Sequence, residues 1–318
     1  MNKEIGGYFG LESFGEKMPY QNALLLNSAR NALRYILRAY GIHKLFVPYY
    51  TCPEVWESVY EEDCEISFYD IGKDFLPTEE FPSDAYVLCN NYFGVCDENI
   101  NKLFGKYSNL IIDNAQSFYS TPFGLASFYS PRKFFGLPDG GLLFCEKRID
   151  EQLELDISFG RTAHLLKRHD LGASDGYSDF RANEASLSQQ PIRKMSRLTQ
   201  AMMGNINYEK VRKRRNENFG FLRKTLDTIN EIKFKENIGV PMVYPFLRTH
   251  ASECLRGKLL KQKIYIPCYW GEIERTAPQN SQSVYLSNNL LPLPIDQRYT
   301  ADDMRCLVRI IKGDIEGE

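Results

Sequence analysis

Apolar positions recur at helical and strand spacing along most of the chain from residue 22 onward. The clearest helical pattern lies in NSARNALRYILRAYG, where the apolar residues between Ala29 and Tyr40 share one face. Ser28 stands in the N-cap position before this face, and Gly41 follows it where a helix commonly ends. The pattern therefore predicts a helix from about residue 29 to residue 40.

Short apolar runs alternate with helical patterns through the first half of the chain, which is typical of βαβ units and a largely parallel sheet. The runs predicted to be strands are 44–47, 65–69, 85–88, 109–112 and 141–144, and another strand-like run precedes Lys133. We therefore expect an α/β fold in which a mostly parallel sheet lies between helices, giving a three-layer αβα domain.

The second half of the chain is harder to interpret. Residues 150–205 are polar and weakly periodic, so they form either long loops or a helix that lies over a partner. Residues 206–229 have helically spaced apolar positions beside a basic run, which predicts a long helix linking two domains. Beyond residue 230, VPMVYPFL and KIYIPCYW carry strand signals, with helical stretches before and after the second. We expect a small α+β domain there.

These patterns suggest a division into two domains. The first, residues 1–205, is the large domain and includes an N-terminal arm over residues 1–20. The second, residues 206–318, contains the linking helix and the small C-terminal domain.

Charge and composition narrow the class of protein. The 318 residues include 39 Lys and Arg against 41 Asp and Glu, for a net charge of -2, which indicates neither a nucleic-acid partner nor a membrane partner. The N-terminal sequence MNKEIGGYFGLESFGEK lacks the apolar core of a signal peptide. We therefore expect a cytoplasmic protein.

The eight cysteines are scattered, at positions 52, 64, 89, 96, 145, 254, 268 and 306. They form no C-x-x-C pair and no Cys/His cluster at metal-ligand spacing, so we expect no metal site. Several lie in apolar, strand-like runs, which fits a reducing compartment better than a disulfide framework.

Candidate chemistry is concentrated between residues 109 and 143. A predicted strand ends in Asp113, and ligands of open parallel sheets bind at the carboxyl ends of the strands. A carboxylate there can pair with a protonated ring nitrogen. Lys133 lies between the second strand-like run and the turn sequence GLPDGG at 136–141. An acid and a lysine are thus predicted at one edge of the sheet.

At this point the sequence resembles the DegT-type sugar aminotransferases, a branch of the fold-type I pyridoxal-phosphate-dependent enzymes. The resemblance runs over nearly the whole chain and is carried by the segments NSARNAL (27–33), VPYYT (47–51), NYFG (91–94), DNAQ (113–116), KFFGLPDGG (133–141) and LPIDQRY (293–299). It implies a large cofactor-binding domain, a small domain that closes over the substrate, and pyridoxal 5'-phosphate as the cofactor.

The resemblance also implies roles for individual residues. Lys133 would hold the cofactor covalently and later shuttle the substrate proton. Asp113 would pair with the pyridine nitrogen and keep it protonated, which makes the ring an electron sink. Gln116 would lie near the phenolic oxygen of the cofactor.

The cofactor phosphate is expected at the start of the first helix. Ser28 and the backbone amides of Ala29 and Arg30 would receive it, since a helix N-terminus presents unpaired N–H groups. A further hydroxyl contact comes from Ser130, three residues before the lysine, or from Ser127, six residues before it.

The chain departs from the family pattern in several places. Cys52 stands where the family often has an aromatic residue stacked on the cofactor ring, so Tyr50 or Tyr92 would stack instead. The usual Gly-Thr of the phosphate helix is Ala29-Arg30, and the usual Gly-Glu-Gly-Gly after the lysine is Pro-Asp-Gly-Gly at 138–141. These changes indicate a divergent branch.

The tract GYSDFRANEASL occupies the place where the family reaches across a dimer interface to the partner's phosphate. Arg181 or Asn183 would make that contact here, and a solvated loop is the alternative interpretation. The resemblance implies a homodimer whose active sites form at the interface.

The activity implied by the resemblance is transfer of an amino group, with glutamate as donor, to a nucleotide-linked keto sugar used for a surface polysaccharide. Two alternatives stay open. One is another pyridoxal-phosphate reaction on a sugar nucleotide, such as dehydration, although those relatives replace the lysine by histidine. The other is a non-catalytic homologue that binds the cofactor or a sugar nucleotide.

Overall fold

The computed structural model describes residues 7–15, 18–236, 238–248 and 252–315. The first helix, α1 (Ala29–Tyr40), has the predicted ends. Ser28 caps it by accepting a hydrogen bond from the Asn31 amide, and Gly41 ends it in the left-handed region at φ 64°. The local pattern of caps and apolar positions was therefore sufficient to define this helix.

A seven-stranded sheet forms the main body, in the order β1-β7-β6-β5-β4-β2-β3. Its strands are β1 (Leu24–Leu26), β2 (Lys44–Pro48), β3 (Glu65–Tyr69), β4 (Val87–Asn90), β5 (Leu110–Asp113), β6 (Ala126–Tyr129) and β7 (Gly141–Cys145). Strands β3, β2, β4, β5 and β6 run parallel, and β7 is antiparallel to both of its neighbours. The strands predicted for this sheet are all present, although β4 begins two residues later than expected, and β1 was not among the predicted strands.

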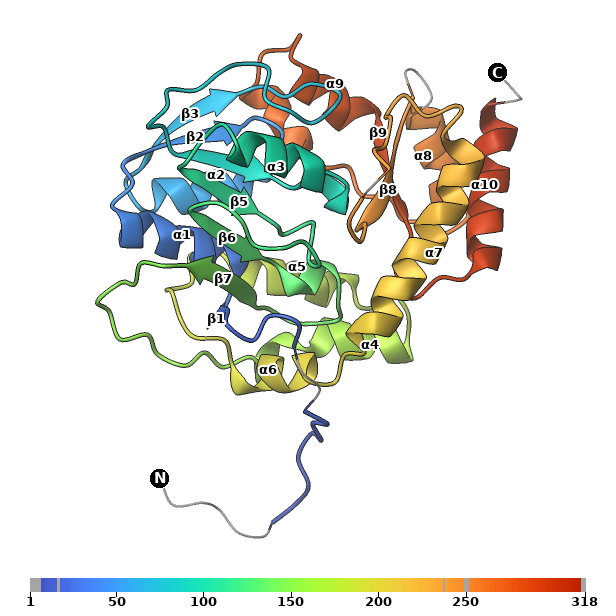
Figure 1. Ribbon diagram of the computed structural model, residues 1–318. Coiled ribbons are helices and arrows are strands. Elements are labelled where there is room, and N and C mark those ends of the chain that lie inside the picture. The colour runs from blue at the N-terminus through green and yellow to red at the C-terminus, as the bar shows by residue number, and fades with distance from the viewer. Residues whose placement is uncertain (1–6, 16–17, 237, 249–251, 316–318) are drawn as a thin grey trace.

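Successive strand residues point to opposite faces of the sheet and into two hydrophobic cores. In β5, Ile111 joins the core under α1, whereas Leu110 and Ile112 join the other core. The first face is covered by α1 and α2 (Pro53–Tyr60), and α3 (Asp97–Phe104) lies on the opposite side (Figure 1). The sheet is therefore the middle of three layers, as predicted for the αβα arrangement.

The polar region 150–205 is more regular than its sequence indicates. It contains α4 (Ala163–Asp170), α5 (Tyr177–Ser186) and α6 (Arg197–Met203), with a short 3-10 turn, η3 (Phe159–Arg161), before them. These helices lie beside the β1–β7 edge of the sheet (Figure 1). Most residues of α4 and α5 are exposed, so these two helices have few apolar positions and weak helical periodicity.

The long helix predicted here is present as α7 (Tyr208–Leu226). The C-terminal elements that follow it are β8 (Val243–Leu247), α8 (Ser252–Lys261), η4 (Gly271–Arg275), α9 (Gln282–Asn289), β9 (Leu290–Pro294) and α10 (Ala301–Ile315). Helix α7 packs against β8 and α10 (Figure 1). The exact division of the chain at residue 205 stays a prediction, and the proposed arm at 1–20 falls partly outside the described residues, at 1–6 and 16–17.

One strand prediction in this region was wrong. The run KIYIPCYW, at 263–270, is irregular, and the strand paired with β8 is β9, in antiparallel register with Pro245 opposite Pro292. Residues 264–266 alternate in the strand manner, but Pro267 removes a backbone donor directly after them. The structure pairs LLPLP instead, in a two-stranded sheet where each strand is an edge and prolines are tolerated.

The described residues contain no helix long and apolar enough to cross a membrane. Within the same part of the chain, the seven described cysteines are free and no cluster of His, Cys, Asp and Glu could hold a metal ion. The side chain of Cys254 lies outside the described residues.

Candidate active site

The candidate site is built at the carboxyl ends of the central strands. Asp113 is the last residue of β5, and it lies in register beside Asn90, the last residue of β4. Because the two strands run parallel, both ends lie at one edge of the sheet, and ligands of open parallel sheets bind at this edge. The sequence predicted Asp113 at such an edge but did not identify Asn90.

Asp113 is buried, and one oxygen of its carboxylate accepts a hydrogen bond from the Ala115 amide at 2.7 Å. Burial raises the pKa of this carboxyl group, and the positive charge of Lys133 together with the Ala115 bond offsets part of that increase. The ionised form is thus incompletely compensated by the protein. A cation placed against it would supply the missing compensation.

Lys133 lies at the end of a short 3-10 turn, η2 (Pro131–Lys133), directly after β6. Its backbone amide donates to the Ser130 carbonyl at 3.2 Å, while its side chain is exposed. Among the described residues, none forms a hydrogen bond or ion pair with its amine. Its charge nevertheless affects the pKa of Asp113, Cys52 and Glu54, so these four residues share one electrostatic environment.

Gln116 lies three residues after Asp113 and is also buried. Its side-chain oxygen accepts a hydrogen bond from the Phe93 amide at 2.9 Å. Its Nε2 is buried with no hydrogen-bond partner among the described residues. A buried amide donor without an acceptor costs free energy, so a ligand oxygen at this point would be stabilising.

The start of α1 packs closely against the start of β7. Gly140 has φ +111°, and its amide donates to the Asn27 carbonyl at 2.9 Å. A Cβ on Gly141 would lie 2.3 Å from the Ser28 carbonyl oxygen and 2.8 Å from the Ala29 nitrogen, so only glycine fits there. The Gly-Gly pair in the sequence is therefore what lets the lysine segment approach the first turn of α1.

The two candidate serines near the lysine are in different states. Ser127 accepts a hydrogen bond from the Phe123 amide at 2.9 Å and donates to the Phe123 carbonyl at 2.6 Å. Ser130 precedes η2, and its hydroxyl has no hydrogen bond to another described residue. The Ser127 hydroxyl thus holds its own loop, whereas the Ser130 hydroxyl is available.

Tyr50 and Tyr92, the residues predicted to stack on the cofactor ring, are more deeply buried than Cys52. Tyr50 and Tyr92 are both almost fully buried in an aromatic cluster with Trp270, and the hydroxyl of Tyr92 donates to the Tyr50 carbonyl at 2.7 Å. Cys52 is only partly buried and is the N-cap residue of α2. Burial raises the pKa of the Cys52 thiol to about 12, so it is neutral at pH 7 despite the nearby charge of Lys133.

A cluster of ion pairs lies next to the lysine and the start of α1. Arg30 pairs with Glu54 at 3.2 Å and with Glu184 at 3.7 Å, and Arg132 contacts the same Glu184. Burial and then the charge of Arg30 lower the pKa of Arg132 to about 10, which leaves it cationic at neutral pH. The guanidinium of Arg30 is therefore held by carboxylates, while its backbone amide remains at the helix start.

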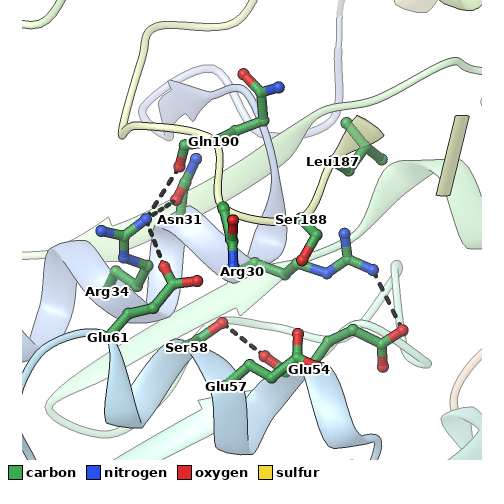
Figure 2. A pocket seen from close by; sticks show the side chains of 11 residues that line it. Arg30, Asn31, Arg34, Glu54, Glu57, Ser58, Glu61, Leu187, Ser188 and Gln190 are labelled. Carbon is green, nitrogen blue, oxygen red and sulfur yellow. Dashed lines mark hydrogen bonds and ion pairs between the residues drawn. The ribbon is translucent and has the colours of Figure 1, made fainter. Parts of the chain in front are cut away.

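Figure 2 shows the pocket on the outer side of this cluster, where α1, α2 and residues 187–190 meet. Arg30 points toward Glu54 on one side of it, and Arg34 pairs with Glu61 at 2.9 Å on the other. Both arginines are paired with carboxylates, so the pocket is a neutralised surface and not an anion site.

Two residues proposed to act across a dimer interface lie on α5. Arg181 is exposed, whereas Asn183 is buried and donates to the Pro138 carbonyl at 2.7 Å. Asn183 therefore holds the turn after the lysine within its own chain. The tertiary structure also adds residues that the sequence did not single out: Asn90, Glu54, Arg132 and Glu184. They come from four separate segments, and no local pattern relates them.

The residues present fit pyridoxal phosphate on three observations. The buried carboxylate of Asp113 lacks a full counter-charge, the Nε2 of Gln116 lacks an acceptor among the described residues, and the exposed Lys133 is close enough to Asp113 for its charge to affect the pKa of that carboxyl group. A protonated ring nitrogen, a ring oxygen and an aldehyde are the complementary groups of this cofactor.

Neither a protein-family model nor a curated protein matches this chain. Solved structures do resemble it. A DegT DnrJ EryC1 StrS aminotransferase from Brucella abortus is 17% identical with a TM-score of 0.63, over 92% of this chain and 85% of that one. The aminotransferase TlmJ from Streptoalloteichus hindustanus is 13% identical with a TM-score of 0.67, over 93% and 86%.

A third structure, the E. coli GDP-4-keto-6-deoxy-D-mannose-3-dehydratase with bound hydrated PLP, is 16% identical with a TM-score of 0.62, over 93% of this chain and 88% of that one. At these identities the likeness establishes the fold. The chain therefore has the fold of the fold-type I pyridoxal-phosphate-dependent enzymes, and its structural neighbours include DegT-type sugar aminotransferases.

Proposed function

We propose that this protein is a pyridoxal-phosphate-dependent aminotransferase that transfers an amino group from glutamate to a nucleotide-linked keto sugar for a surface polysaccharide. The observation that carries the proposal is that Lys133 acts electrostatically on the buried Asp113 at the carboxyl end of β5, with the unpartnered Nε2 of Gln116 three residues further along the chain. These three residues supply the amine, the counter-charge and the donor that amino transfer through this cofactor requires. The fold shared with sugar aminotransferases supports the same reading.

The cofactor, when bound, supplies a conjugated cationic ring that accepts electrons from the substrate carbon. The carboxylate of Asp113 would hold a proton on the ring nitrogen, and its incomplete compensation in the protein would strengthen that contact. Gln116 would donate Nε2–H to an oxygen of the cofactor. The amine of Lys133 would bind the cofactor covalently and, once released by the amino donor, would take up the proton that leaves the substrate carbon.

The phosphate is assigned to the start of α1. Ser28 accepts from the Asn31 amide at 3.1 Å and still has its own hydroxyl proton to donate. The amides of Ala29 and Arg30 belong to the first turn, where N–H groups have no partner within the helix. Ser130 adds a second hydroxyl, and the occupied Ser127 hydroxyl does not.

A homodimer is part of the proposal. The surface of α4 and α5 exposes large apolar side chains, those of Leu166, Leu171, Tyr177 and Phe180, around the exposed Arg181. Exposed apolar side chains gathered in one region mark interaction surfaces. A second copy covering this region would place Arg181 against the partner's site, while Asn183 stays in its own chain.

The sugar-nucleotide acceptor rests on the neighbours in this fold, one of which is a dehydratase that acts on a GDP-linked keto sugar. Lys133 favours amino transfer over dehydration, because it retains an amine where the dehydratases are expected to have histidine. The substitutions Ala29, Arg30 and Cys52 are what a non-catalytic binding protein would also show, and the experiment below separates the two functions.

The test is the absorbance of the full chain with pyridoxal phosphate, before and after adding glutamate. The wild type should show the band of the lysine-bound cofactor, and glutamate should convert it to a shorter-wavelength species. Lys133→Ala should lose the band, whereas Lys102→Ala, at an exposed position of α3, should keep it. No band with the wild type would refute cofactor binding. A band that glutamate leaves unchanged would indicate the binding protein.

A further inference from the structure

The turn that carries Lys133 is tied to distant parts of the chain through the residue that follows it. The carbonyl oxygen of Phe134 accepts a hydrogen bond from Gln297 Nε2 at 2.8 Å and a second from Arg215 at 3.3 Å. Arg215 lies on the linking helix α7, and Gln297 lies in the loop after β9. Two elements outside the main sheet therefore hold the backbone next to the lysine.

Arg215 is the largest fully buried side chain of the described residues, and its side-chain hydrogen bonds go to other segments of the chain. Its Nε donates to the Gln297 side-chain oxygen at 3.1 Å, and one terminal nitrogen donates to the carbonyls of Pro241 and Met242 at 3.3 and 2.9 Å. Its guanidinium also stacks over the Phe134 ring, 4.5 Å from the centroid. A buried guanidinium is costly unless its donors are satisfied, so this geometry is strongly fixed.

The same network reaches the other side of the site. Met242 donates its amide to the Phe93 carbonyl at 2.7 Å, and Phe93 donates its amide to Gln116 at 2.9 Å. Arg215 thus contacts the segment after Lys133 directly and reaches the segment that orients Gln116 through Met242. The two predicted cofactor-contacting segments are joined through α7 and the residues leading into β8.

We propose that Arg215 and Gln297 are positioning residues, which set the orientation of Lys133 by holding the Phe134 carbonyl and couple the lysine turn to the linking helix and the loop after β9. The role of Lys133 itself rests on the proposed function. The coupling is a property of the chain alone. If the C-terminal elements moved relative to the sheet, Arg215 and Gln297 would shift the Phe134 carbonyl and with it the backbone of Lys133.

Gln297 is the residue to change, because it is only partly buried and its loss leaves Arg215 with three other acceptors. In Gln297→Met, the chain length is kept and both hydrogen bonds are removed. Gln297→Glu keeps an acceptor for Arg215 Nε but removes the donor to the Phe134 carbonyl. Both variants should loosen the lysine turn.

Asn218 supplies a matched control. It lies one turn further along α7 and donates to the carbonyls of Ile295 and Tyr299, both at 3.1 Å. Asn218→Leu therefore breaks the attachment of the same loop to the same helix without touching Phe134. A purely structural role for the network predicts that the Asn218 and Gln297 variants behave alike.

The first measurement is amide hydrogen exchange over residues 131–137 in the full chain without added cofactor. The Gln297 variants should exchange about tenfold faster there, which corresponds to the loss of one hydrogen bond. Asn218→Leu should exchange at the wild-type rate in this segment, even where it lowers the melting temperature. Equal exchange in all four proteins, or equal acceleration in the Asn218 variant, would overturn the coupling.

The second measurement is the rate at which the lysine-bound absorption band appears with pyridoxal phosphate, and the pH at its midpoint. The Gln297 variants should bind about tenfold more slowly and with a shifted midpoint, while Asn218→Leu follows the wild type. Wild-type kinetics in the Gln297 variants would refute the positioning role. If the wild type gives no band, the proposed function fails, and the exchange comparison still decides the coupling.

Discussion

Two buried aspartates, Asp113 at the end of β5 and Asp139 just before β7, lie in regions that differ in how many partners they offer a carboxylate. Asp139 is fully buried and accepts hydrogen bonds from Ser158, Thr199 and Arg161. Asp113 accepts one backbone hydrogen bond, from Ala115, and burial leaves its pKa raised. One carboxylate is saturated by its own chain, and the other is not.

The number of hydrogen-bond donors around a buried carboxylate indicates whether it stabilises the fold or can bind a ligand. A carboxylate surrounded by donors from distant segments stabilises the fold and has no capacity left for a ligand. A carboxylate that is buried with few donors carries a cost, which a bound cation repays. Asp139 therefore anchors the turn between Lys133 and β7, and Asp113 is the carboxylate that we propose binds a positively charged ring.

The largest expected effect is that of Asp113→Asn on turnover. The side-chain shape and the bond to Ala115 are kept, but the charge that holds a proton on the cofactor ring is lost. Turnover with glutamate should fall about a hundredfold or more, as is usual when one electrostatic group is removed from a reaction centre. The melting temperature without cofactor should stay the same or rise. Wild-type turnover in steady-state assays would contradict the assignment.

Asp139→Asn should have the opposite effects: lower stability, with turnover per folded molecule largely kept. Removing the charge weakens three buried hydrogen bonds, although Arg161 keeps Asp156 at 2.6 Å. We expect the free energy of unfolding to fall by about 3 kcal/mol, the lower end of the cost of breaking a buried ion pair. Urea denaturation measures this change directly. An unchanged unfolding midpoint, or a loss of turnover per folded molecule as large as that of Asp113→Asn, would remove the distinction between the two aspartates.

The smallest effect is on the pH dependence of stability. The folded state holds the Asp113 proton more tightly than the unfolded state, so this contribution favours folding at low pH and is lost as pH rises through the folded pKa. The contribution of Glu54 to stability has the opposite pH dependence. Burial alone would raise its pKa, but its own backbone amide, Arg30 and Lys133 lower it, so its contribution is lost as pH falls.

Thermal melting of the chain without cofactor between about pH 3 and 7, the range in which carboxyl groups titrate, tests these signs. Relative to wild type, Asp113→Asn should gain stability as pH rises, and Glu54→Gln should lose it. Parallel curves for the two variants would show that their carboxyl groups do not differ in the folded state.

Much of the main domain follows from local pattern. Ser28 and Gly41 bound α1 because cap residues act on the backbone beside them, and Asp113 ends β5 because a charged residue closes an apolar run. The C-terminal sheet did not follow in this way. Its second strand contains Pro292 and Pro294, and it pairs with β8 across more than forty residues, so local propensity argued against it.

In the candidate site, too, some features follow from local sequence and others depend on distant contacts. Lys133, Asp113, Gln116 and Ser28 could be proposed from the sequence because each lies in a short motif at or close after the end of an element, or directly before the start of one. The sequence did not decide between Ser127 and Ser130. That choice depends on the Phe123 loop, which occupies the Ser127 hydroxyl.

The sequence by itself determined which segments form the proposed site, because helix starts, strand ends and glycine turns are set by neighbouring residues. Only the tertiary structure decided which polar groups in those segments remain unsatisfied. Asp139 meets Ser158 and Thr199, and Phe134 meets Arg215 and Gln297, through contacts between residues far apart in the chain. The number of hydrogen bonds that a buried carboxylate accepts depends on those distant partners. Among the described residues Asp139 has several such partners and Asp113 has none, so only the carboxylate of Asp113 can still accept hydrogen bonds from a ligand.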